Sequence, residues 1–263
     1  LPALPIQYID FAQWQRAWLN GGELERQVAY WREQLAGVET LNLPTDFSRR
    51  ADTGFDGAVF DITLDRELVA GLNRLSRQKG ATLYMTLMAG FMVLLGRYSA
   101  QRDITVGSPI ANRHHAEIEP LIGCFINSLV IRGSVEPEVP FEQLLAQVCK
   151  NTLDAYAHQD VPFERLVEEL VTDRNLHNSP LFQVMFALQN VPMETRSVIP
   201  GLKLDPIPEP HVVAKFDLSV SLLEVDDIIR GEVVYRTGLF TDSTVRRMMD
   251  QYIMLLRSIV ASP

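Results

Sequence analysis

Polar side chains that could do chemistry are concentrated in one segment of the chain, residues 106–132. The segment contains Ser108, Asn112, Arg113, His114, His115, Glu117, Glu119, Cys124 and Asn127. Imidazole, carboxylate and thiol groups perform general acid–base and nucleophilic catalysis. The apolar flanks predict one strand that ends at Val106 and a second over 125–132, with a turn at Gly107 and Pro109 between them. We therefore expect a polar loop between buried strands, a common place for functional residues.

The elements that must position this loop follow from apolar periodicity along the chain. Helices are predicted over 8–20, 23–35, 66–79, 80–96, 140–156, 162–170 and 241–260, and strands over 59–64, 104–106, 125–132, 181–188, 202–204, 216–225 and 228–235. Asp65 is expected to cap the helix that follows it, and Gly80 to end that helix. The strands over 216–225 and 228–235 are expected to form a hairpin with its turn at Asp226 and Asp227. The helix over 140–156 is expected to bury a one-sided apolar stripe of Phe141, Leu144, Leu145, Val148, Leu153 and Tyr156. The uncharged run 80–96 predicts a fully buried helix, and the strand over 181–188 is predicted to be central. Interleaved helices and strands favour an α/β fold, a mixed β-sheet flanked by helices, in one domain.

Composition and charge narrow the classes of function. The chain has 263 residues, 47% hydrophobic content and a formal net charge of -9, which argues against a broad phosphate-binding face and a nucleic-acid partner. We expect no membrane partner, because no apolar run is long enough for a span, and residues 1–7 lack the basic region of a signal peptide. The only cysteines, Cys124 and Cys149, fit a reducing compartment, so a cytoplasmic location is expected. The first residue is not Met, and we interpret the chain as a piece of a longer protein.

Several short segments matter together because of their order. They are YIDFAQW at 8–14, IGCFINSLVIR at 122–132, HQDVPFE at 158–164 and SPLFQVMF at 179–186, followed by KFDLSVSL at 215–222 and YRTGLF at 235–240. Through this ordered set the chain resembles the condensation domains of non-ribosomal peptide synthetases. The resemblance covers nearly the whole length of the chain, which makes it far more specific than any single motif.

The resemblance implies a domain of two similar halves, each with a chloramphenicol acetyltransferase-like fold, which face one another across a tunnel. That family joins an acyl or peptidyl thioester to the amine of an aminoacyl thioester, and carrier domains bring both on phosphopantetheine arms. This chain resembles only the second half, so residues 1–263 are expected to be the C-terminal subdomain. The implied partners are the N-terminal half, upstream and downstream carrier domains and an adjoining adenylation domain, with no cofactor bound directly and no metal. A module that only docks a carrier domain, or half of an epimerisation or heterocyclisation domain, remains an alternative.

Two adjacent histidines imitate the family's catalytic signature, in which a histidine pair precedes Asp-Gly. Here His114 and His115 precede Glu119 and Pro120 with the same spacing. The pair lies after YIDFAQW, whereas the signature comes before that motif in the family, and proline lacks the backbone freedom of glycine. We therefore expect two solvated loop histidines, no catalytic residue in this chain and no activity of this half alone. An unrelated transferase that uses His114 and His115 is the remaining alternative.

The resemblance assigns roles to residues near this pair. Arg113, in SPIANR, matches the family arginine that pairs with the aspartate of the signature and supports the catalytic loop, a task that suits a planar, permanently charged guanidinium. Phe125, Asn127 and Ser128 match the loop that floors the tunnel. The Asn127 amide either orients a thioester carbonyl or ties the loop to the backbone, and both readings stay open. Cys124 is expected to be a small buried thiol and Cys149 a packing residue.

The remaining motif residues are expected to be structural. They are Tyr8, Asp10, Trp14, His158, Asp160 and Pro162. Asp10 falls where the first turn of a helix favours a carboxylate, and Phe11 and Trp14 are expected in the core. Asp160 is expected to accept hydrogen bonds from the free amides of the helix that Pro162 opens.

Overall fold

The structure of the protein is a computed structural model that describes residues 4–49, 54–171, 181–189 and 211–263. Its strands are β1 (Asp56–Leu64), β2 (Asp103–Ile110), β3 (Asn127–Ser134), β4 (Val184–Gln189), β5 (Val212–Val213), β6 (Leu218–Val225) and β7 (Ile228–Arg236). Its helices are α1 (Tyr8–Trp18), α2 (Leu24–Gln34), α3 (Arg66–Gln78), α4 (Leu83–Ser99), α5 (Phe141–Ala157), α6 (Phe163–Leu170) and α7 (Asp242–Ala261), with a π-helical turn η1 (Leu19–Glu23) and a 3-10 turn η2 (Ala116–Ile118). The strand predicted over 202–204 lies outside the described residues.

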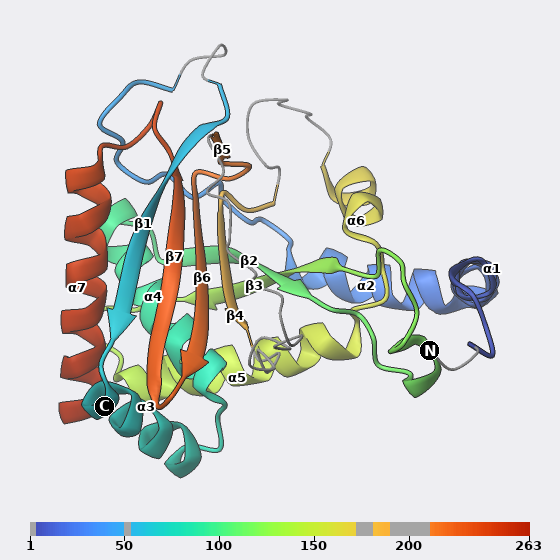
Figure 1. Cartoon of the computed structure of the whole chain (residues 1–263), viewed down its shortest axis with the longest axis horizontal. Helices are drawn as coiled ribbons and strands as arrows, with labels where there is room; N and C mark the ends of the chain where they lie inside the picture. Colours follow the sequence, from blue (N-terminus) through green and yellow to red (C-terminus); the bar gives the residue numbers. More distant parts are fainter. Residues whose placement is uncertain (1–3, 50–53, 172–180, 190–210) are drawn as a thin grey trace, which may run out of the picture.

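One mixed sheet contains all the described strands, in the order β3-β2-β4-β6-β7-β1-β5 (Figure 1). β4 runs parallel to both of its neighbours, β2 and β6, and the other neighbouring pairs are antiparallel. The interior place of β4 confirms the prediction of a central strand. The predicted hairpin of β6 and β7 is confirmed too, and its turn residues Asp226 and Asp227 have φ angles of 51° and 66°, which tight hairpin turns require.

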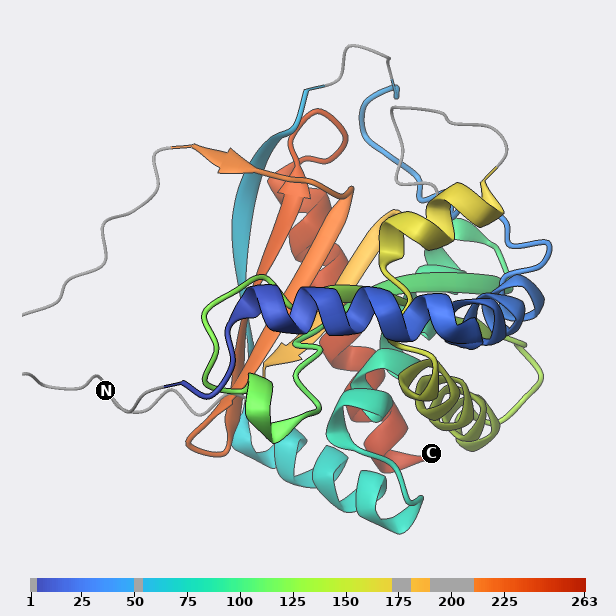
Figure 2. The same cartoon turned by 90° about the vertical axis from the view of Figure 1, so that its right-hand side faces the viewer.

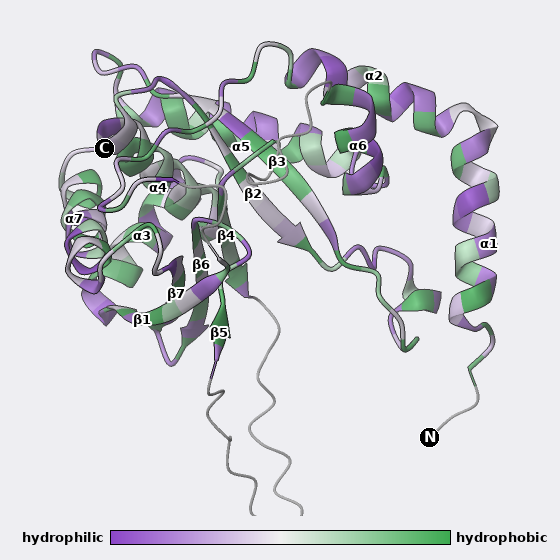
Figure 3. Ribbon diagram, turned by 90° about the horizontal axis from the view of Figure 1, so that it is seen from above, coloured by the Kyte–Doolittle hydropathy of each residue, from purple (hydrophilic) through white to green (hydrophobic). Residues whose placement is uncertain are grey.

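A layer of helices covers one face of this sheet (Figures 1 and 3). Helix α4 lies in its middle and contacts α3, α5 and α7. As predicted, α4 is almost fully buried; Met88, Phe91 and Leu95 have no exposed surface. Removal of this apolar surface from water is the main stabilising term of such a layer. The predicted α/β fold, a mixed sheet flanked by helices, is therefore confirmed.

Two local predictions on helix ends are confirmed by their caps. The side-chain Oδ1 of Asp65 accepts the backbone N–H of Leu68 at 3.0 Å, which satisfies one free amide at the start of α3. Gly80 follows α3 with a φ of 65°, a conformation that glycine adopts without steric cost. These caps depend only on neighbours in sequence, which is why the sequence reveals them.

The predicted turn at Gly107 and Pro109 is wrong, because both residues lie inside β2. β3 continues the antiparallel ladder along them, pairing Gly107 with Val130 and Pro109 with Ser128. Gly107 serves close packing, since a Cβ added there would lie 2.2 Å from the Phe182 ring. Accordingly β3 begins at 127 instead of 125, and the polar loop is shorter than expected.

The apolar stripe predicted for the long helix α5 is wrong at its C-terminal end. Leu153 is 59% exposed and Tyr156 is 37% exposed. The buried positions there are Thr152 and Ala155, because small side chains let α5 lie close to its neighbours. The earlier part of the stripe, including Leu145 and Val148, is buried as expected.

In the described part of the chain, no single helix is long and apolar enough to cross a membrane, and α3 with α4 passes that test only as a pair bent by 104°.

Candidate functional site

Residues 111–126, which connect β2 to β3, form a polar arm that lies against α1 and away from the helix layer (Figures 2 and 3). A second hydrophobic cluster, separate from the main core, joins the arm to this helix. It consists of Phe11, Ile118, Leu121 and Phe125. Because the first of these comes from α1 and the others from the arm, the two segments form one local unit. This unit contains most of the side chains that the sequence singles out for function.

Arg113 organises the arm from inside. Its Nη1 donates to the carbonyl oxygens of Ile118, Glu119 and Leu121 at 2.6, 3.0 and 2.8 Å. The guanidinium also lies 4.0 Å from the centre of the Phe125 ring, a cation–π contact. Its Nη2 also points to the Gly123 carbonyl oxygen at 3.4 Å, and a lysine ammonium has neither this second nitrogen nor a planar face for the Phe125 ring. In this structure Arg113 is therefore the residue that folds the arm.

Helix α1 is attached to the arm through Tyr8. The Tyr8 hydroxyl donates to the carbonyl oxygen of Cys124 at 2.9 Å, and its ring meets the Phe125 ring edge-on at 5.1 Å. The ring covers Gly123, where an added Cβ would lie 2.3 Å from it. Asp10 occupies the first turn as predicted, and its carboxylate accepts the backbone N–H of Gln7 at 2.8 Å in a capping box.

The side chain of Asn127 is fully used by the backbone around it. Its Nδ2 donates to the carbonyl oxygens of Gln159 and Val161, both at 2.8 Å. Its Oδ1 accepts the N–H groups of Ser128 and Phe163 at 2.9 and 3.0 Å. Of the two readings left open by the sequence, these contacts support the one in which Asn127 ties the loop to the backbone.

The capping role predicted for Asp160 is wrong. Asn127, not Asp160, accepts the first amide of α6, and the N-cap residue Pro162 makes no side-chain cap. Asp160 instead accepts a hydrogen bond from Gln27 Nε2 at 2.9 Å, and its own N–H donates to Gln27 Oε1 at 3.1 Å. In the turn before α6, the Asp160 side chain is directed towards α2. Its hydrogen-bond partner is therefore distant in sequence.

The α5–α6 turn is held to α2 by further polar contacts. The Tyr30 ring stacks on the His158 ring at 3.9 Å, and Trp31 Nε1 donates to the His158 carbonyl oxygen at 2.9 Å. Burial raises the pKa of Tyr30 to about 12, so its hydroxyl stays neutral. Glu23, which accepts from Gln27 at 2.7 Å, has its pKa lowered to about 2, mainly by a hydrogen bond from Arg26. These contacts agree with a structural role for His158.

The histidine pair lies on the surface of the arm, and both residues are exposed. His114 Nε2 is 3.5 Å from Asp160 Oδ1, and the His115 ring meets the Trp14 ring edge-on at 5.4 Å. The His114–Asp160 contact is at the long limit of a hydrogen bond, and both histidines are exposed to solvent. The arrangement agrees with the expectation of solvated loop histidines.

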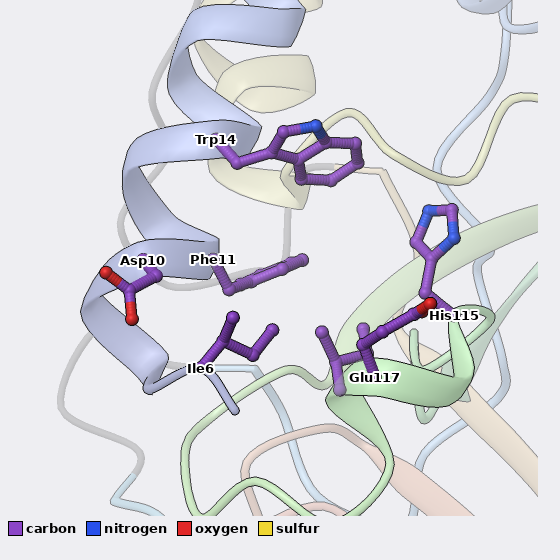
Figure 4. A pocket seen from close by; sticks show the side chains of 7 residues that line it. Ile6, Asp10, Phe11, Trp14, His115 and Glu117 are labelled. Carbon is purple, nitrogen blue, oxygen red and sulfur yellow. The ribbon is translucent and has the colours of Figure 1, made fainter. Parts of the chain in front are cut away.

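An open apolar groove of about 410 Å³ separates α1 from η2 (Figure 4). Figure 4 shows Trp14 and Phe11 projecting from α1 towards His115 and Glu117 on the arm. Phe11 is buried as predicted, but Trp14 is 44% exposed, so the prediction of a core position for Trp14 is wrong. The facing His115 ring meets the indole only edge-on, so one wall of the groove stays open to solvent.

A smaller cavity of about 140 Å³ lies between α1, the two ends of the arm and the α5–α6 turn, and we call it the Asn112 cavity. Its polar lining includes Gln15, Asn112, Asp160 and Glu164. Asn112 is 9% exposed, and its buried Oδ1 has no hydrogen-bond partner in the described part of the chain. Asn112 also has a φ of 52°, a left-handed conformation in which asparagine is enriched. The sequence marks Asn112 only as one polar residue among several, and the left-handed turn after a strand is the feature that could have singled it out.

Cys149 packs against the main core as expected, whereas Cys124 does not have the surroundings expected for it. Cys124, expected to be buried, is exposed at the mouth of the Asn112 cavity. Cys149 is half-buried on α5, where burial raises the pKa of its thiol. Within the described ranges, no group of three or more histidine, cysteine or carboxylate side chains could hold a metal ion.

The described residues form a mixed seven-stranded sheet flanked by helices. This architecture is consistent with the class of proteins that have a chloramphenicol acetyltransferase-like fold. Solved structures share it. The X-domain from teicoplanin biosynthesis superposes with a TM-score of 0.91 and 26% sequence identity over 100% of this chain and 61% of that chain. The four-domain non-ribosomal peptide synthetase holo-AB3403, bound to AMP and glycine, superposes with a TM-score of 0.78 and 21% identity over 91% of this chain and 19% of that chain, a likeness of fold alone.

Sequence comparison then gives the family. The model of the condensation domain matches residues 1–263, so the chain belongs to the condensation-domain family. Tyrocidine synthase 3 of Brevibacillus parabrevis is 41% identical over 100% of this chain and 4% of that protein. Gramicidin S synthase 2 of Brevibacillus brevis is 39% identical over 100% of this chain and 6% of that protein. The chain therefore spans a small fraction of the curated relatives it matches.

Proposed function

We propose that this chain is the C-terminal half of a condensation domain, which forms an amide bond between a donor acyl or peptidyl thioester and the amine of an acceptor aminoacyl thioester. The observation that carries the proposal is the match of the condensation-domain family to the whole chain. The coverage of the teicoplanin X-domain supports the assignment to one half, because the chain corresponds to 61% of that protein.

Several apolar side chains on the arm and on α1 are exposed, which supports the proposal that another part of the domain packs against them. Ile122 and Ile126 on the arm are 93% and 70% exposed, and Ile9 on α1 is 62% exposed. Trp14 adds the bare wall of the groove in Figure 4. Large apolar side chains that lie this far out of the core are candidates for contact with another protein part. The N-terminal half of the domain is the partner that the proposal assigns to them.

In the complete domain, the amine must be neutral, lie close to the thioester carbon, and attack as negative charge develops on the carbonyl oxygen. The N-terminal half supplies the histidine signature. Arg113, whose Nη1 is held by the arm carbonyls, supports that loop by pairing with its aspartate through Nε and Nη2. Phe125, Asn127 and Ser128 contribute the tunnel floor through the backbone that the Asn127 amide holds in place. Carrier domains deliver both thioesters on phosphopantetheine, and an adjoining adenylation domain supplies the activated amino acid.

Amide formation with loaded donor and acceptor carrier domains tests this proposal. The chain alone is expected to give no product above background, and the domain restored by its N-terminal half is expected to turn over. Arg113→Lys in the restored domain should lower the rate at least about tenfold, since a lysine cannot form the paired contact with a carboxylate. Turnover by the chain alone, or an unchanged rate for the lysine variant, would contradict the roles proposed here.

A further inference from the structure

Helix α1 and the arm are joined more firmly to each other than to the rest of the chain. Phe11, the only buried residue of α1, packs in the small cluster that the arm completes and not in the main core. The Tyr8 hydroxyl adds its hydrogen bond to the Cys124 carbonyl oxygen. We call residues 4–18 and 111–126 the α1–arm unit, and the other described residues the body. Side chains that share one cluster open and move together, so this unit is expected to behave as one piece.

The connection from α1 to the body contains a break in the helix. Inside η1, between α1 and α2, Gly22 has a φ of 104° and a ψ of -11°, which are not helical. π-Helical turns and glycines are common at helix kinks. A Cβ added at Gly21 or Gly22 would meet no atom within 4 Å, so the packing around this turn is open. Figure 3 shows α1 turned sharply away from α2 at this point.

On the body side of its connections, the chain is held in place. Val28 and Trp31 of α2 lie in the main core, and Trp31 Nε1 donates to the His158 carbonyl oxygen at 2.9 Å. At the far end of the arm, Asn127 is fixed by the hydrogen bonds of its side chain. At the near end, Asn112 has a φ of 52° shortly after β2.

Few polar interactions hold the unit against the body. Apart from the backbone bonds at its connections, the only hydrogen bond or ion pair across the boundary in the described residues is the 3.5 Å contact between His114 Nε2 and Asp160 Oδ1. The Asn112 cavity, with a volume of about 140 Å³, also lies at this boundary. Two parts of a chain move relative to each other unless the interface between them is large and hydrophobic.

We infer that the α1–arm unit pivots on the body as one piece, with hinges at Gly22, Asn112 and Ile126, and so opens and closes the Asn112 cavity. Hinges are a few residues at the ends of elements that absorb changes in φ and ψ. Glycine does so without steric cost. The pivot moves Phe125 relative to Asn127, which stays with the body. That these two residues form a tunnel floor, and that amide formation uses its movement, rests on the proposed function, whereas the pivot itself does not.

Dipolar electron paramagnetic resonance of spin-label pairs tests the pivot in the full chain, with Cys124→Ser and Cys149→Ser as the background. The exposed positions Gln13→Cys on α1 and Gln78→Cys on α3 report the distance from the unit to the body. Gln13→Cys with the exposed Glu119→Cys on the arm reports a distance within the unit. We expect the first distance distribution to be at least about twice as broad as the second. A first distribution no broader than the second would overturn the inference.

Gly22→Ala tests the hinge, and Gly21→Ala is its matched control. Both positions have open space for the added methyl group, but only Gly22 has a φ that other residues rarely adopt. Gly22→Ala should therefore shift the distance from the unit to the body and leave the distance within the unit unchanged, whereas Gly21→Ala should alter neither. No response to Gly22→Ala, or the same response to both variants, would contradict a hinge at this residue.

A covalent link across the Asn112 cavity tests whether amide formation uses the pivot. Gln15 on α1 and Glu164 on α6 both line the cavity. Gln15→Cys with Glu164→Cys in the restored domain and the same background, joined by a short bis-maleimide, should lower the rate at least about fivefold relative to the unlinked variant. An unchanged rate would overturn the part of the pivot in catalysis. No amide formation by the unlinked restored domain, with both distance distributions as expected, would instead count against the proposed function alone.

Discussion

The Oδ1 atom of Asn127 accepts the backbone N–H of Phe163 at 3.0 Å, so the first residue of β3 caps α6. The same side chain holds the carbonyl oxygens of Gln159 and Val161. One amide thus joins the IGCFINSLVIR segment to the HQDVPFE segment and fixes the turn between α5 and α6. The path of the chain between α5 and α6 therefore depends on this single side chain.

Asn127→Ala is expected to destabilise the chain by about 3 kcal/mol, because it leaves several buried backbone groups without partners. Urea unfolding measures the loss. Asn73, whose exposed amide reaches Glu224 Oε1 at 3.3 Å, offers a matched control, and Asn73→Ala should cost under about 0.5 kcal/mol. Equal costs for the two variants would show that the Asn127 contacts add nothing.

Arg113→Lys is expected to loosen the arm and leave the sheet unchanged. Lysine lacks the second nitrogen that points to the Gly123 carbonyl oxygen and the planar face that lies over the Phe125 ring, so amide exchange over 116–124 should accelerate about tenfold. Hydrogen exchange followed by mass spectrometry measures this, and peptides from β6 and β7 provide the internal reference. Faster exchange in every peptide, or in none, would contradict the local role of the guanidinium.

Gly123→Ala is expected to separate α1 from the arm. The added Cβ would lie 2.3 Å from the Tyr8 ring, so the ring must move and its hydroxyl loses the Cys124 carbonyl. Such overpacking costs about 1–3 kcal/mol. Gly21→Ala is the control, since no atom lies within 4 Å of a Cβ added there. Tryptophan fluorescence, which reports on Trp14 and Trp18 of α1, should change for the first variant only.

Acid should remove one contribution to stability at the start of α2. The hydrogen bond from Arg26 lowers the pKa of Glu23 from 4.5 to about 2. A carboxyl whose pKa is depressed in the folded state stabilises it fully above pH 4.5, and this contribution is lost as the pH falls through about 2. The cost of Glu23→Gln, measured by urea unfolding, should therefore shrink towards zero over this window. The exposed Glu33 on the same helix gives the control Glu33→Gln, whose cost should stay near zero at each pH, and a pH-independent cost of Glu23→Gln would refute the assignment.

The features that the sequence predicts correctly are local in the chain. The Asp65 cap, the Gly80 stop and the turn at Asp226 and Asp227 all involve neighbours within a few residues. The buried helix α4 follows from its composition alone. The prediction of a turn at Gly107 is wrong because glycine occurs both in turns and where side chains pack closely on the backbone. The Phe182 ring, which packs on Gly107, is distant in sequence, so the sequence does not reveal this contact.

The site was harder to predict, because its contacts join distant segments. Asn127 and Phe163 are 36 positions apart, and Gln27 and Asp160 are 133 positions apart. Both Asp160 and Asn127 are plausible helix caps by residue type, and only the three-dimensional path of the chain selects Asn127. Trp14 fits a core position by periodicity, yet the pattern cannot reveal that the arm meets its indole through the edge-on His115 ring and leaves the side chain 44% exposed.

The exposed isoleucines of the arm should become stabilising residues in the complete domain, if the N-terminal half packs on them. Ile126 is 70% exposed, so Ile126→Asp should change the unfolding free energy of the chain alone by under about 0.5 kcal/mol. In the restored domain the same change would place a charge in a buried apolar contact and should cost about 2 kcal/mol or more. Leu153→Asp, at an exposed leucine of α5, is the control and should have the same small effect in both contexts. A cost of Ile126→Asp that does not differ between the two would mean that the N-terminal half leaves this part of the arm uncovered.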